Sequence, residues 1–250
     1  MNLVFHERAE SAHRILNPLT EKKLALVGEI CRLEPALQLL DLACGKAELL
    51  CSWASRYGIQ GVGVDVSEVF LEAARARAAE LTVEAQVELV HGKAEDYQAA
   101  PQAFDIVSCI GATWIGGGLV GTLELMKPAL KPGGLLLVGE PYLIDPPPSG
   151  ALEALGFGAD EFTSLSGTLD RFEECGTDLV EMVLADGDSW DRYMATQWMT
   201  ANTWLREHAD EPDAEEFAGR VAAGRRSYLE YGRRYLGWGV FVLRDKDVAQ

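Results

Sequence analysis

Small and acidic residues follow the first apolar run of this chain. Asp41 lies near the end of residues 37–42, and Ala43, Gly45 and Ala47 come soon after it. Small side chains let a backbone approach a ligand closely, and a helix that starts here offers free N–H groups to that ligand. The loop lacks the pattern G-x-G-x-x-G, so an ordinary turn between a strand and a helix also fits it.

Asp65 provides a second acidic residue, at the end of a later apolar run. It closes residues 60–65, where a carboxylate can accept hydrogen bonds from both hydroxyls of a ribose. Asp65 could instead cap the helix that follows, but Ser67 is better placed for that role. The two loops together favour a site for a cofactor that contains a nucleoside.

Two further loops follow the third and fourth apolar runs. Ala94 and Glu95 come after residues 86–91, where a backbone N–H and a carboxylate could bind the ring nitrogen and the exocyclic amine of an adenine. Glu95 could equally begin a helix. Trp114 follows residues 104–110, and its ring could form a wall of the same site or part of the core.

The elements that must position these loops alternate between strand and helix. Apolar or alternating runs predict strands over residues 37–42, 60–65, 86–91, 104–110 and 135–139. Helical spacing predicts helices over residues 20–33, 47–57, 67–81 and 118–130. This order predicts a parallel, doubly wound α/β sheet, in which ligands bind at the carboxyl ends of the strands.

The second half of the chain has a different pattern. It indicates a helix over residues 160–175, a strand over 178–185, long helices over 188–208 and 213–236, and a last strand over 238–244. The two long helices interrupt what could otherwise be a hairpin of the last two strands.

A set of motifs carries a resemblance to a known family. In order they are LLDLACGKAELL, GVGVDVS, HGKAEDY, FDIVSCIGATW and LKPGGLLLVGEPY, within about residues 37–142. The set resembles class I S-adenosylmethionine-dependent methyltransferases and looks like their ubiquinone-biosynthesis-type, small-molecule branch. Over its full length the chain resembles an uncharacterised group of bacterial methyltransferases, and no substrate comes with that resemblance.

The resemblance implies a fold and a division of the chain. It implies one domain, residues 1–250, built on a Rossmann-like, doubly wound, seven-stranded α/β sheet that is mostly parallel and has an antiparallel last strand. The cofactor core would span about residues 34–142, with an N-terminal lid over about residues 1–23. Helical cap insertions would span about residues 143–170 and 187–236.

The cofactor implied by the resemblance is S-adenosyl-L-methionine. Asp41 would lie near its methionine amino group, Asp65 would hold its ribose, and Glu95 would line the adenine pocket. The full set of implied cofactor contacts is Asp41, Ala43, Cys44, Gly45, Ala47, Asp65, Val66, Ala94, Glu95, Cys109 and Ile110. Ala43 and Ala47 replace the commoner glycines of the family, so we expect a slightly tighter pocket. Lys46 is unusual in so tight a turn, and it should point to solvent or to a lid.

Methyl transfer from a positively charged sulfonium requires mainly orientation, with a base where the acceptor carries a proton. The catalytic candidates are Glu140, Tyr142 and His13. Glu140 and Tyr142 lie at the end of the fifth predicted strand, where the carboxylate could instead make a structural hydrogen bond to loop backbone. His13 lies on the predicted lid.

Trp114, Tyr193, Trp198 and Arg14 are the candidates for contact with the methyl acceptor. Aromatic residues at helical spacing, such as Tyr193 and Trp198, could equally form the packing stripe of a helix. A set of arginines could bind an anionic substrate or pair with acids on a solvated helix face. They are Arg225, Arg226, Arg233 and Arg234.

Other chemistries fit the sequence less well. No group of His, Cys and Asp residues has metal-ligand spacing, so no metal is expected. An NAD-binding Rossmann oxidoreductase would suit Asp65, but the glycine pattern of that class is missing. A cofactor-binding protein without turnover is a third alternative. The acceptor atom could be nitrogen, oxygen, sulfur or carbon.

The overall charge argues against polyanionic partners. With 22 basic and 39 acidic residues the chain carries a net charge of −17, which disfavours nucleic acid and anionic membrane surfaces. The 5 cysteines include no C-x-x-C pair, which is typical of free thiols in a reducing compartment. No apolar run approaches the ~20 residues of a membrane helix. We therefore expect a cytoplasmic monomer or homodimer that acts on a small molecule.

The acidic residues are concentrated in one segment. Residues 140–218 hold 3 basic and 19 acidic residues, whereas residues 219–244 hold six Arg and one Glu. We expect these two segments to neutralise each other in part. If acids such as Asp186, Asp188 and Asp191 faced the site instead, they would favour a cationic substrate.

Overall fold

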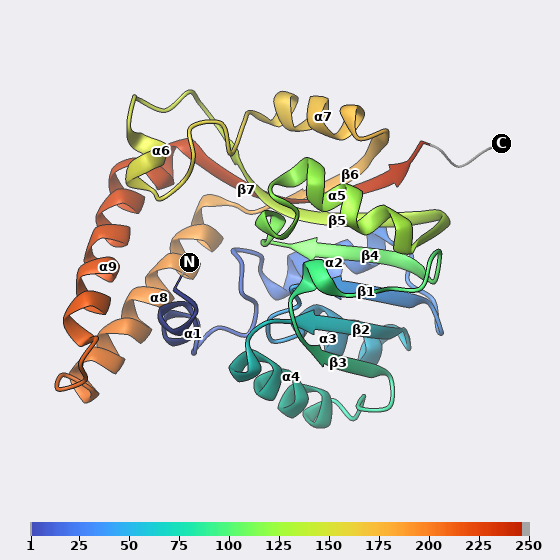
Figure 1. Ribbon diagram of the computed structural model, residues 1–250, viewed down its shortest axis with the longest axis horizontal. Helices are drawn as coiled ribbons and strands as arrows, with labels where there is room; N and C mark the ends of the chain where they lie inside the picture. The colour runs from blue at the N-terminus through green and yellow to red at the C-terminus, as the bar shows by residue number, and fades with distance from the viewer. Residues whose placement is uncertain (1, 247–250) are drawn as a thin grey trace.

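A seven-stranded sheet runs through the protein (Figure 1). In the computed structural model, which describes residues 2–246, the strand order is β3-β2-β1-β4-β5-β7-β6. The strands are β1 (Gln38–Leu42), β2 (Gln60–Asp65), β3 (Val87–His91), β4 (Phe104–Ile110), β5 (Leu130–Leu143), β6 (Thr177–Leu184) and β7 (Leu236–Asp245). Strands β1 to β5 pair in parallel, and β7 pairs antiparallel with both β5 and β6. The predicted sheet, with its antiparallel last strand, is confirmed.

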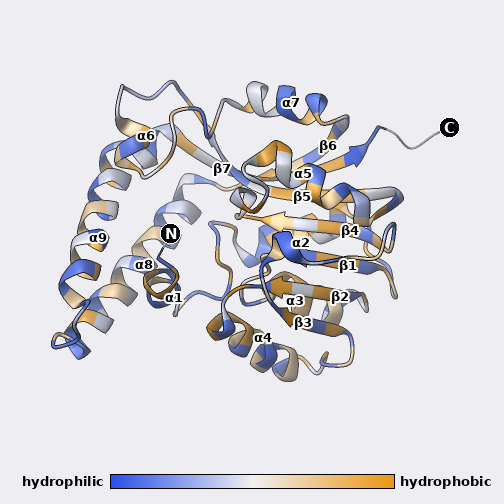
Figure 2. Cartoon of the chain, viewed as in Figure 1, coloured by the Kyte–Doolittle hydropathy of each residue, from blue (hydrophilic) through white to orange (hydrophobic). Residues whose placement is uncertain are grey.

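Helices cover both faces of the sheet and extend beyond one end of it (Figure 1). The α-helices of the first half are α1 (Leu3–Ala9), α2 (Glu21–Ile30), α3 (Glu48–Tyr57), α4 (Glu68–Glu80) and α5 (Leu119–Met126). Those of the second half are α6 (Ala151–Ala154), α7 (Leu165–Glu174), α8 (Gly187–Glu207), α9 (Ala214–Ser227) and α10 (Arg233–Tyr235). One buried cluster joins α2, α3 and α4 to the sheet, and another joins α5 and α7 to it. The central strands accordingly include many apolar residues (Figure 2).

Strand β1 lies at the point where the strand order reverses. Its neighbours are β2 on one side and β4 on the other, so the loops that follow β1 and β4 lead to opposite faces of the sheet. Such a switch point opens a crevice outside the carboxyl ends of the strands. The loops singled out from the sequence therefore meet at one edge of the sheet.

A cap of three helices lies beside this edge (Figure 1). Helix α8 packs against both α9 and α1, and a small core of Phe5, Ala201 and Phe217 joins the three. Helix α1 was not predicted, since seven residues carry too little periodicity to stand out. The side chain of Asn2 caps it by accepting from the Phe5 N–H, and burial of Phe5 anchors it.

Several element boundaries differ from the sequence prediction. Helix α5 ends at Met126 because Pro128 lies in a short 3-10 turn, where its missing N–H costs nothing. Strand β5 begins at Leu130, earlier than the predicted strand over 135–139, and the β4–β5 register shifts between Phe104 and Ile106. The predicted helix over 213–236 is interrupted by a π-helical turn at Tyr228–Gly232.

The acidic and arginine-rich segments are joined across the cap at one place. Arg233 on α10 pairs with Asp191 on α8 at 3.0 Å, and Tyr228 donates to the same carboxylate at 2.8 Å. Asp186 caps α8 and pairs with Lys23 at 2.6 Å. Neutralisation across the cap is therefore partial, as expected. All 5 cysteines are free, and none of the helices within residues 2–246 has the length and apolarity to cross a membrane.

Candidate functional site

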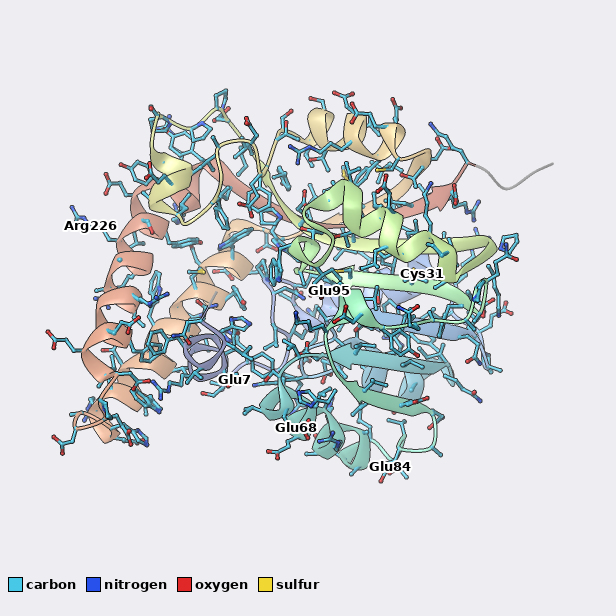
Figure 3. The ribbon with its side chains drawn as sticks, in the orientation of Figure 1. Glu7, Cys31, Glu68, Glu84, Glu95 and Arg226 are labelled. Atoms are coloured by element: carbon cyan, nitrogen blue, oxygen red, sulfur yellow. The ribbon has the colours of Figure 1, made fainter. Side chains whose placement is uncertain are left out.

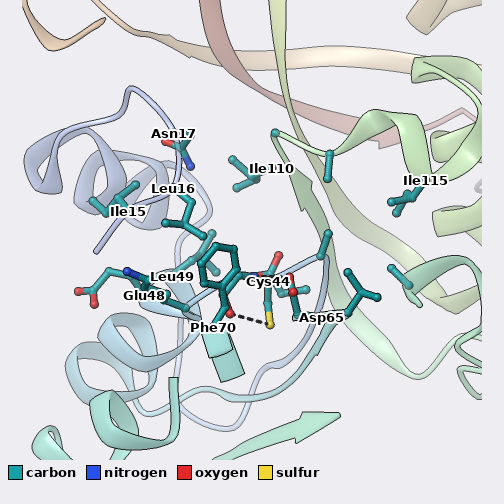
Figure 4. Close-up of a pocket in the computed structure, with 18 of the residues that line it drawn as sticks. Ile15, Leu16, Asn17, Cys44, Glu48, Leu49, Asp65, Phe70, Ile110 and Ile115 are labelled. Atoms are coloured by element: carbon teal, nitrogen blue, oxygen red, sulfur yellow. Dashed lines mark hydrogen bonds between the residues drawn. The ribbon is translucent and has the colours of Figure 1, made fainter. Parts of the chain in front are cut away.

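A cavity of about 440 Å³ lies at the carboxyl ends of β1, β2 and β4 (Figure 4). Residues 14–17 cover it from the N-terminal side, and residues 110–115 form the opposite wall. The predicted site residues that line it are Arg14, Asp41, Ala43, Cys44, Gly45, Asp65, Val66, Ala94, Glu95, Ile110, Trp114 and Tyr193. The topology therefore brings most of the predicted cofactor contacts into one hollow.

The loop after β1 folds through three residues of left-handed backbone. The φ angles are +59° at Ala43, +55° at Gly45 and +51° at Ala47. Glycine adopts this conformation freely, whereas an alanine there costs on the order of 1 kcal/mol. The two alanines thus keep the backbone shape that the family usually builds with glycine. A Cβ on Gly45 would lie 2.6 Å from Cδ1 of Leu16, so a larger residue at that position would require the Leu16 side chain to move.

Asp65 ties the β1 and β2 loops together. One carboxylate oxygen accepts from the Gly45 N–H and the other from the Ser67 N–H, each at 2.8 Å. Ser67 caps α4 as predicted, by accepting from the Phe70 N–H. Burial raises the pKa of Asp65 against the opposing effect of these backbone hydrogen bonds. Each carboxylate oxygen keeps a further lone pair for a ligand hydroxyl.

Asp41 is a buried acid in the cavity wall whose side chain has one hydrogen-bond donor among residues 2–246. It is 4% exposed, and the Ser108 hydroxyl donates to its carboxylate at 2.6 Å. Burial raises the pKa of Asp41 to about 7, and the charge of Asp65 adds to the effect. A cationic group placed against Asp41 would restore the ionised form.

The wall on the β2 and β3 side combines apolar residues such as Val66 and Ala94 with the charged Lys93 and Glu95. Val66 is 48% exposed at the cavity, and Ala94 is buried behind it. Ala94 begins a single 3-10 turn that also contains Glu95. The alternative in which Glu95 begins a helix is therefore met only by this one turn and not by an α-helix. Phe70 of α4 contributes a ring that sequence reasoning did not identify (Figure 4), and His6 of α1 packs edge-on against it.

Lys46 fastens the β1 loop to the N-terminal segment, defined here as residues 2–20. Its Nζ donates to the backbone carbonyls of Glu10, Ser11 and His13, at 2.9, 2.9 and 2.6 Å. We expected this side chain to point either to solvent or to a lid, and it points to the N-terminal segment. The signal in the sequence was a lysine where a tight turn normally has a small residue.

Glu10 fastens the same segment to the cap, a role that no motif in the sequence indicated. Its fully buried carboxylate accepts from the Tyr193 hydroxyl and from the Gln197 amide, both at 2.5 Å. His13 Nδ1 lies 2.8 Å from the second carboxylate oxygen, although poorly aligned for a hydrogen bond. Burial acts to raise the pKa of Glu10, but His13 and the Tyr193 hydroxyl outweigh it, and the pKa lies below its ordinary value.

Two of the predicted catalytic residues lie behind the cavity wall. Glu140 is 2% exposed, one of its carboxylate oxygens has no hydrogen-bond partner within residues 2–246, and it lies outside the cavity lining. Burial raises its pKa to about 7, opposed by a hydrogen bond from Thr113. The ring of Tyr142 is buried over Gly237 of β7.

The remaining predicted residues also lie outside the cavity lining. His13 reaches it only through Tyr193, with ring centroids 4.7 Å apart. Ala47 and Cys109 are fully buried beneath it. Trp198 lies in a separate cavity between the cap helices, where its ring meets Tyr228 edge-on.

The acids considered for a cationic substrate face other partners. Asp186 and Asp191 hold the contacts with Lys23 and Arg233, and neither of them nor Asp188 lines the cavity. The inference of a cationic acceptor from the acidic segment is therefore not supported.

The sequence of the central sheet matches a known family. The family described as "Methyltransferase domain" matches residues 39–134. Over 97% of its length, and 98% of the other chain, this protein superposes with a TM-score of 0.92 on a SAM-dependent methyltransferase from Geobacter sulfurreducens crystallised with S-adenosyl-L-homocysteine, at 43% identity. The chain belongs to the class I S-adenosylmethionine-dependent methyltransferases, as its motifs predicted.

Two curated relatives also match most of the chain. The chain is 42% identical over 237 residues, 94% of its length and 95% of the relative's, to "Uncharacterized protein YjhP" of Escherichia coli. It is 25% identical over 213 residues, 85% of its length and 67% of the relative's, to "27-O-demethylrifamycin SV methyltransferase" of Amycolatopsis mediterranei. The narrower assignment to a ubiquinone-biosynthesis-type branch stays a prediction.

Proposed function

We propose that this protein binds S-adenosylmethionine in the cavity at the carboxyl ends of β1, β2 and β4 and transfers its methyl group to a small-molecule acceptor. The observation that carries the proposal is the convergence of Asp41, Gly45 and Asp65 on one cavity. When bound, the cofactor supplies an activated methyl group on a positively charged sulfur.

The residues of the cavity fit such a ligand. Gly45 leaves the β1 loop open where a Cβ would collide with Leu16, and the nearby carboxylate of Asp41 suits an ammonium group. Asp65 keeps acceptor capacity for ribose hydroxyls, while Val66 and Ala94 offer the apolar surface that an adenine ring needs.

The acceptor is placed against residues 110–115 in this proposal. Trp114 is 58% exposed and lines the cavity together with Ile110 and Ile115, so this wall suits an apolar or aromatic molecule. A curated relative whose name specifies 27-O-demethylrifamycin SV supports a small organic acceptor. The net charge of −17 also disfavours a nucleic-acid acceptor.

The N-terminal segment acts as a lid over the cofactor in this proposal. Lys46 ties it to the cofactor loop and Glu10 ties it to α8, which together exclude water from the reacting atoms. Tyr193, backed by His13, lines the cavity, and its hydroxyl donates to Glu10 and to the Leu16 carbonyl, so its role in this proposal is to hold the N-terminal segment over the cofactor. Glu140 supports the loop of residues 111–116 from behind through its hydrogen bond with Thr113, whereas Tyr142 packs over Gly237 of β7.

The test has a binding arm and a turnover arm. Calorimetry with S-adenosylhomocysteine should detect one site, which Asp65→Asn weakens. Incubation with S-adenosylmethionine that carries an isotopically labelled methyl group and a panel of phenols, amines and thiols should label a product, and Trp114→Ala should reduce that labelling.

The outcomes separate the alternatives. Binding without labelling of any acceptor would favour a cofactor-binding protein without turnover. Binding of NADH in place of S-adenosylhomocysteine would overturn the proposal in favour of an oxidoreductase.

A further inference from the structure

A second cavity, of about 260 Å³, lies within the cap between α1, α8 and α9. Its walls are apolar and aromatic, and its rim is basic. The apolar residues are Phe5, Met194, Trp198, Phe217 and Val221, and the basic ones are Arg220 and Arg225. No Asp or Glu among the described residues lines it, so the two arginines set the electrostatic character of the cavity.

This cavity is separate from the cofactor cavity. His6 is the single residue that lines both, because α1 lies between the two hollows. One side of α1 presents Phe5 to the cap, where its ring lies 5.2 Å from that of Phe217. The other side presents Leu3 to the cofactor cavity.

The arginines of the last helices are paired in different ways. Arg226 lies 3.8 Å from Glu230, and Arg233 pairs with Asp191. Arg234 lies over the ring of Tyr235. Within residues 2–246, Arg225 alone of these four makes neither an ion pair nor a ring contact, and it lines the cavity.

Arg220 completes the basic rim. Its guanidinium lies 5.3 Å from the centre of the Phe5 ring, and its pair with Glu216 at 3.1 Å is more than half exposed on both sides. An exposed pair of this kind contributes little and exchanges readily for another anion. Two guanidinium groups beside an aromatic pocket, in a chain of net charge −17, select a ligand that is both apolar and anionic.

We propose that this cavity binds a small aromatic carboxylate. The ring packs among Phe5, Trp198 and Phe217, and the carboxylate pairs with Arg225 and Arg220. The site is distinct from the cofactor site and does not depend on the proposed function.

The occupant would brace the wall between the two cavities. Glu7, on the same helix as Phe5, accepts a hydrogen bond from Ser67 at 2.6 Å, and the Ser67 N–H is bonded to Asp65. A ligand that holds α1 in place therefore stabilises the surroundings of Asp65 without contacting it.

The experiment compares two probes of the same shape, 2-naphthoate and its neutral amide, by calorimetry on the protein with and without S-adenosylhomocysteine. We expect 2-naphthoate to bind with or without S-adenosylhomocysteine, about fivefold more tightly than the amide. Arg225→Gln should abolish the preference for the acid. Arg226→Gln is the matched control, because Arg226 is the next residue on α9, projects away from the cap (Figure 3) and lies outside this cavity.

Several results would overturn the proposal. They are equal binding of acid and amide, an unchanged preference in Arg225→Gln, and displacement of 2-naphthoate by S-adenosylhomocysteine. Val221→Trp fills the cavity and should remove binding of both probes. Thermal unfolding of Val221→Trp shows whether its fold is intact. If Val221→Trp is unfolded, the result for Arg225→Gln decides whether the proposal holds.

Discussion

Glu10 in the N-terminal segment and Asp41 at the end of β1 are both removed from solvent, yet their pKa values shift in opposite directions. Burial acts to raise both. For Glu10 the neighbouring His13 and Tyr193 outweigh burial and lower the pKa, whereas among residues 2–246 Asp41 has one side-chain donor, Ser108. The difference distinguishes a carboxylate with several internal partners from one with a single internal partner, which leaves room for a ligand in our proposal.

The contrast extends to the two regions around these acids. The seam between the N-terminal segment and α8 is held by hydrogen bonds from Tyr193 and Gln197 to one carboxylate oxygen of Glu10, which suits a structural latch. The cofactor loop keeps strained backbone and spare acceptor capacity, which suits a ligand.

The largest effect is expected for Glu10→Ala. Removal of the carboxylate leaves Tyr193 and Gln197 without their acceptor, so urea unfolding at pH 7 should show a loss of about 3 to 4 kcal/mol. Because the pKa of Glu10 is lowered, its stabilisation is present above pH 4.5 and is lost as the pH falls through the folded-state value. Glu7→Ala, which removes a single hydrogen bond on α1, should lose about 1 kcal/mol. Equal losses in the two variants would contradict the latch.

Glu140 is a buried carboxylate that has one oxygen without a hydrogen-bond partner among residues 2–246 and that does not line the cofactor cavity. Its pKa rises from 4.5 to about 7, so the unfolded chain loses its proton first and stability falls as the pH rises through that window. In Glu140→Gln the difference in unfolding free energy between pH 5 and pH 8 should shrink by about 2 to 3 kcal/mol. The Asp41 contribution is common to both proteins. An unchanged difference would show that Glu140 finds a partner in solution.

Asp41→Asn tests whether the missing partner of this acid is the ligand. At pH 8 the affinity for S-adenosylhomocysteine should fall by about 30-fold, since a charged contact to the ligand amino group is lost. The wild-type affinity should weaken as the pH drops below about 7, where Asp41 takes up a proton, and the variant should lack this dependence. Calorimetry at a series of pH values makes the comparison, and parallel profiles would refute the role of Asp41.

The smallest effect concerns the strained loop. Ala43→Gly relieves a left-handed alanine but adds freedom to the unfolded chain, so the net gain in unfolding free energy should be about 0.5 kcal/mol. Gly45→Ala should do the reverse, because its Cβ would meet Leu16 at 2.6 Å. Thermal unfolding of both variants gives the signs, and a destabilised Ala43→Gly would mean that the methyl group packs better than its backbone suggests.

The sequence was informative where function depends on local spacing. Asp41 and Asp65 lie at the carboxyl ends of strands and Gly45 lies just after one, at an edge that any parallel sheet brings together, so their convergence could be predicted from the order of elements. Ser67 could be recognised as a helix cap from its position at the start of the predicted helix over 67–81.

Contacts across the cap could not be predicted in this way. Tyr193 lies 183 residues from Glu10 in sequence, and no local pattern in either segment indicates that the two side chains form a hydrogen bond. Glu140 looked catalytic because it ends a strand, but the fold turns it behind the loop of residues 111–116. A residue's position along a strand predicts the edge that it reaches, whereas its side of the sheet depends on packing.

Titration of the wild-type protein with S-adenosylhomocysteine by calorimetry tests the account most directly. One site per chain is expected, with an affinity that increases as the pH rises through about 7 and that Asp65→Asn weakens. Absence of binding at concentrations on the order of hundreds of micromolar, which corresponds to a binding free energy weaker than about −5 kcal/mol, would contradict it.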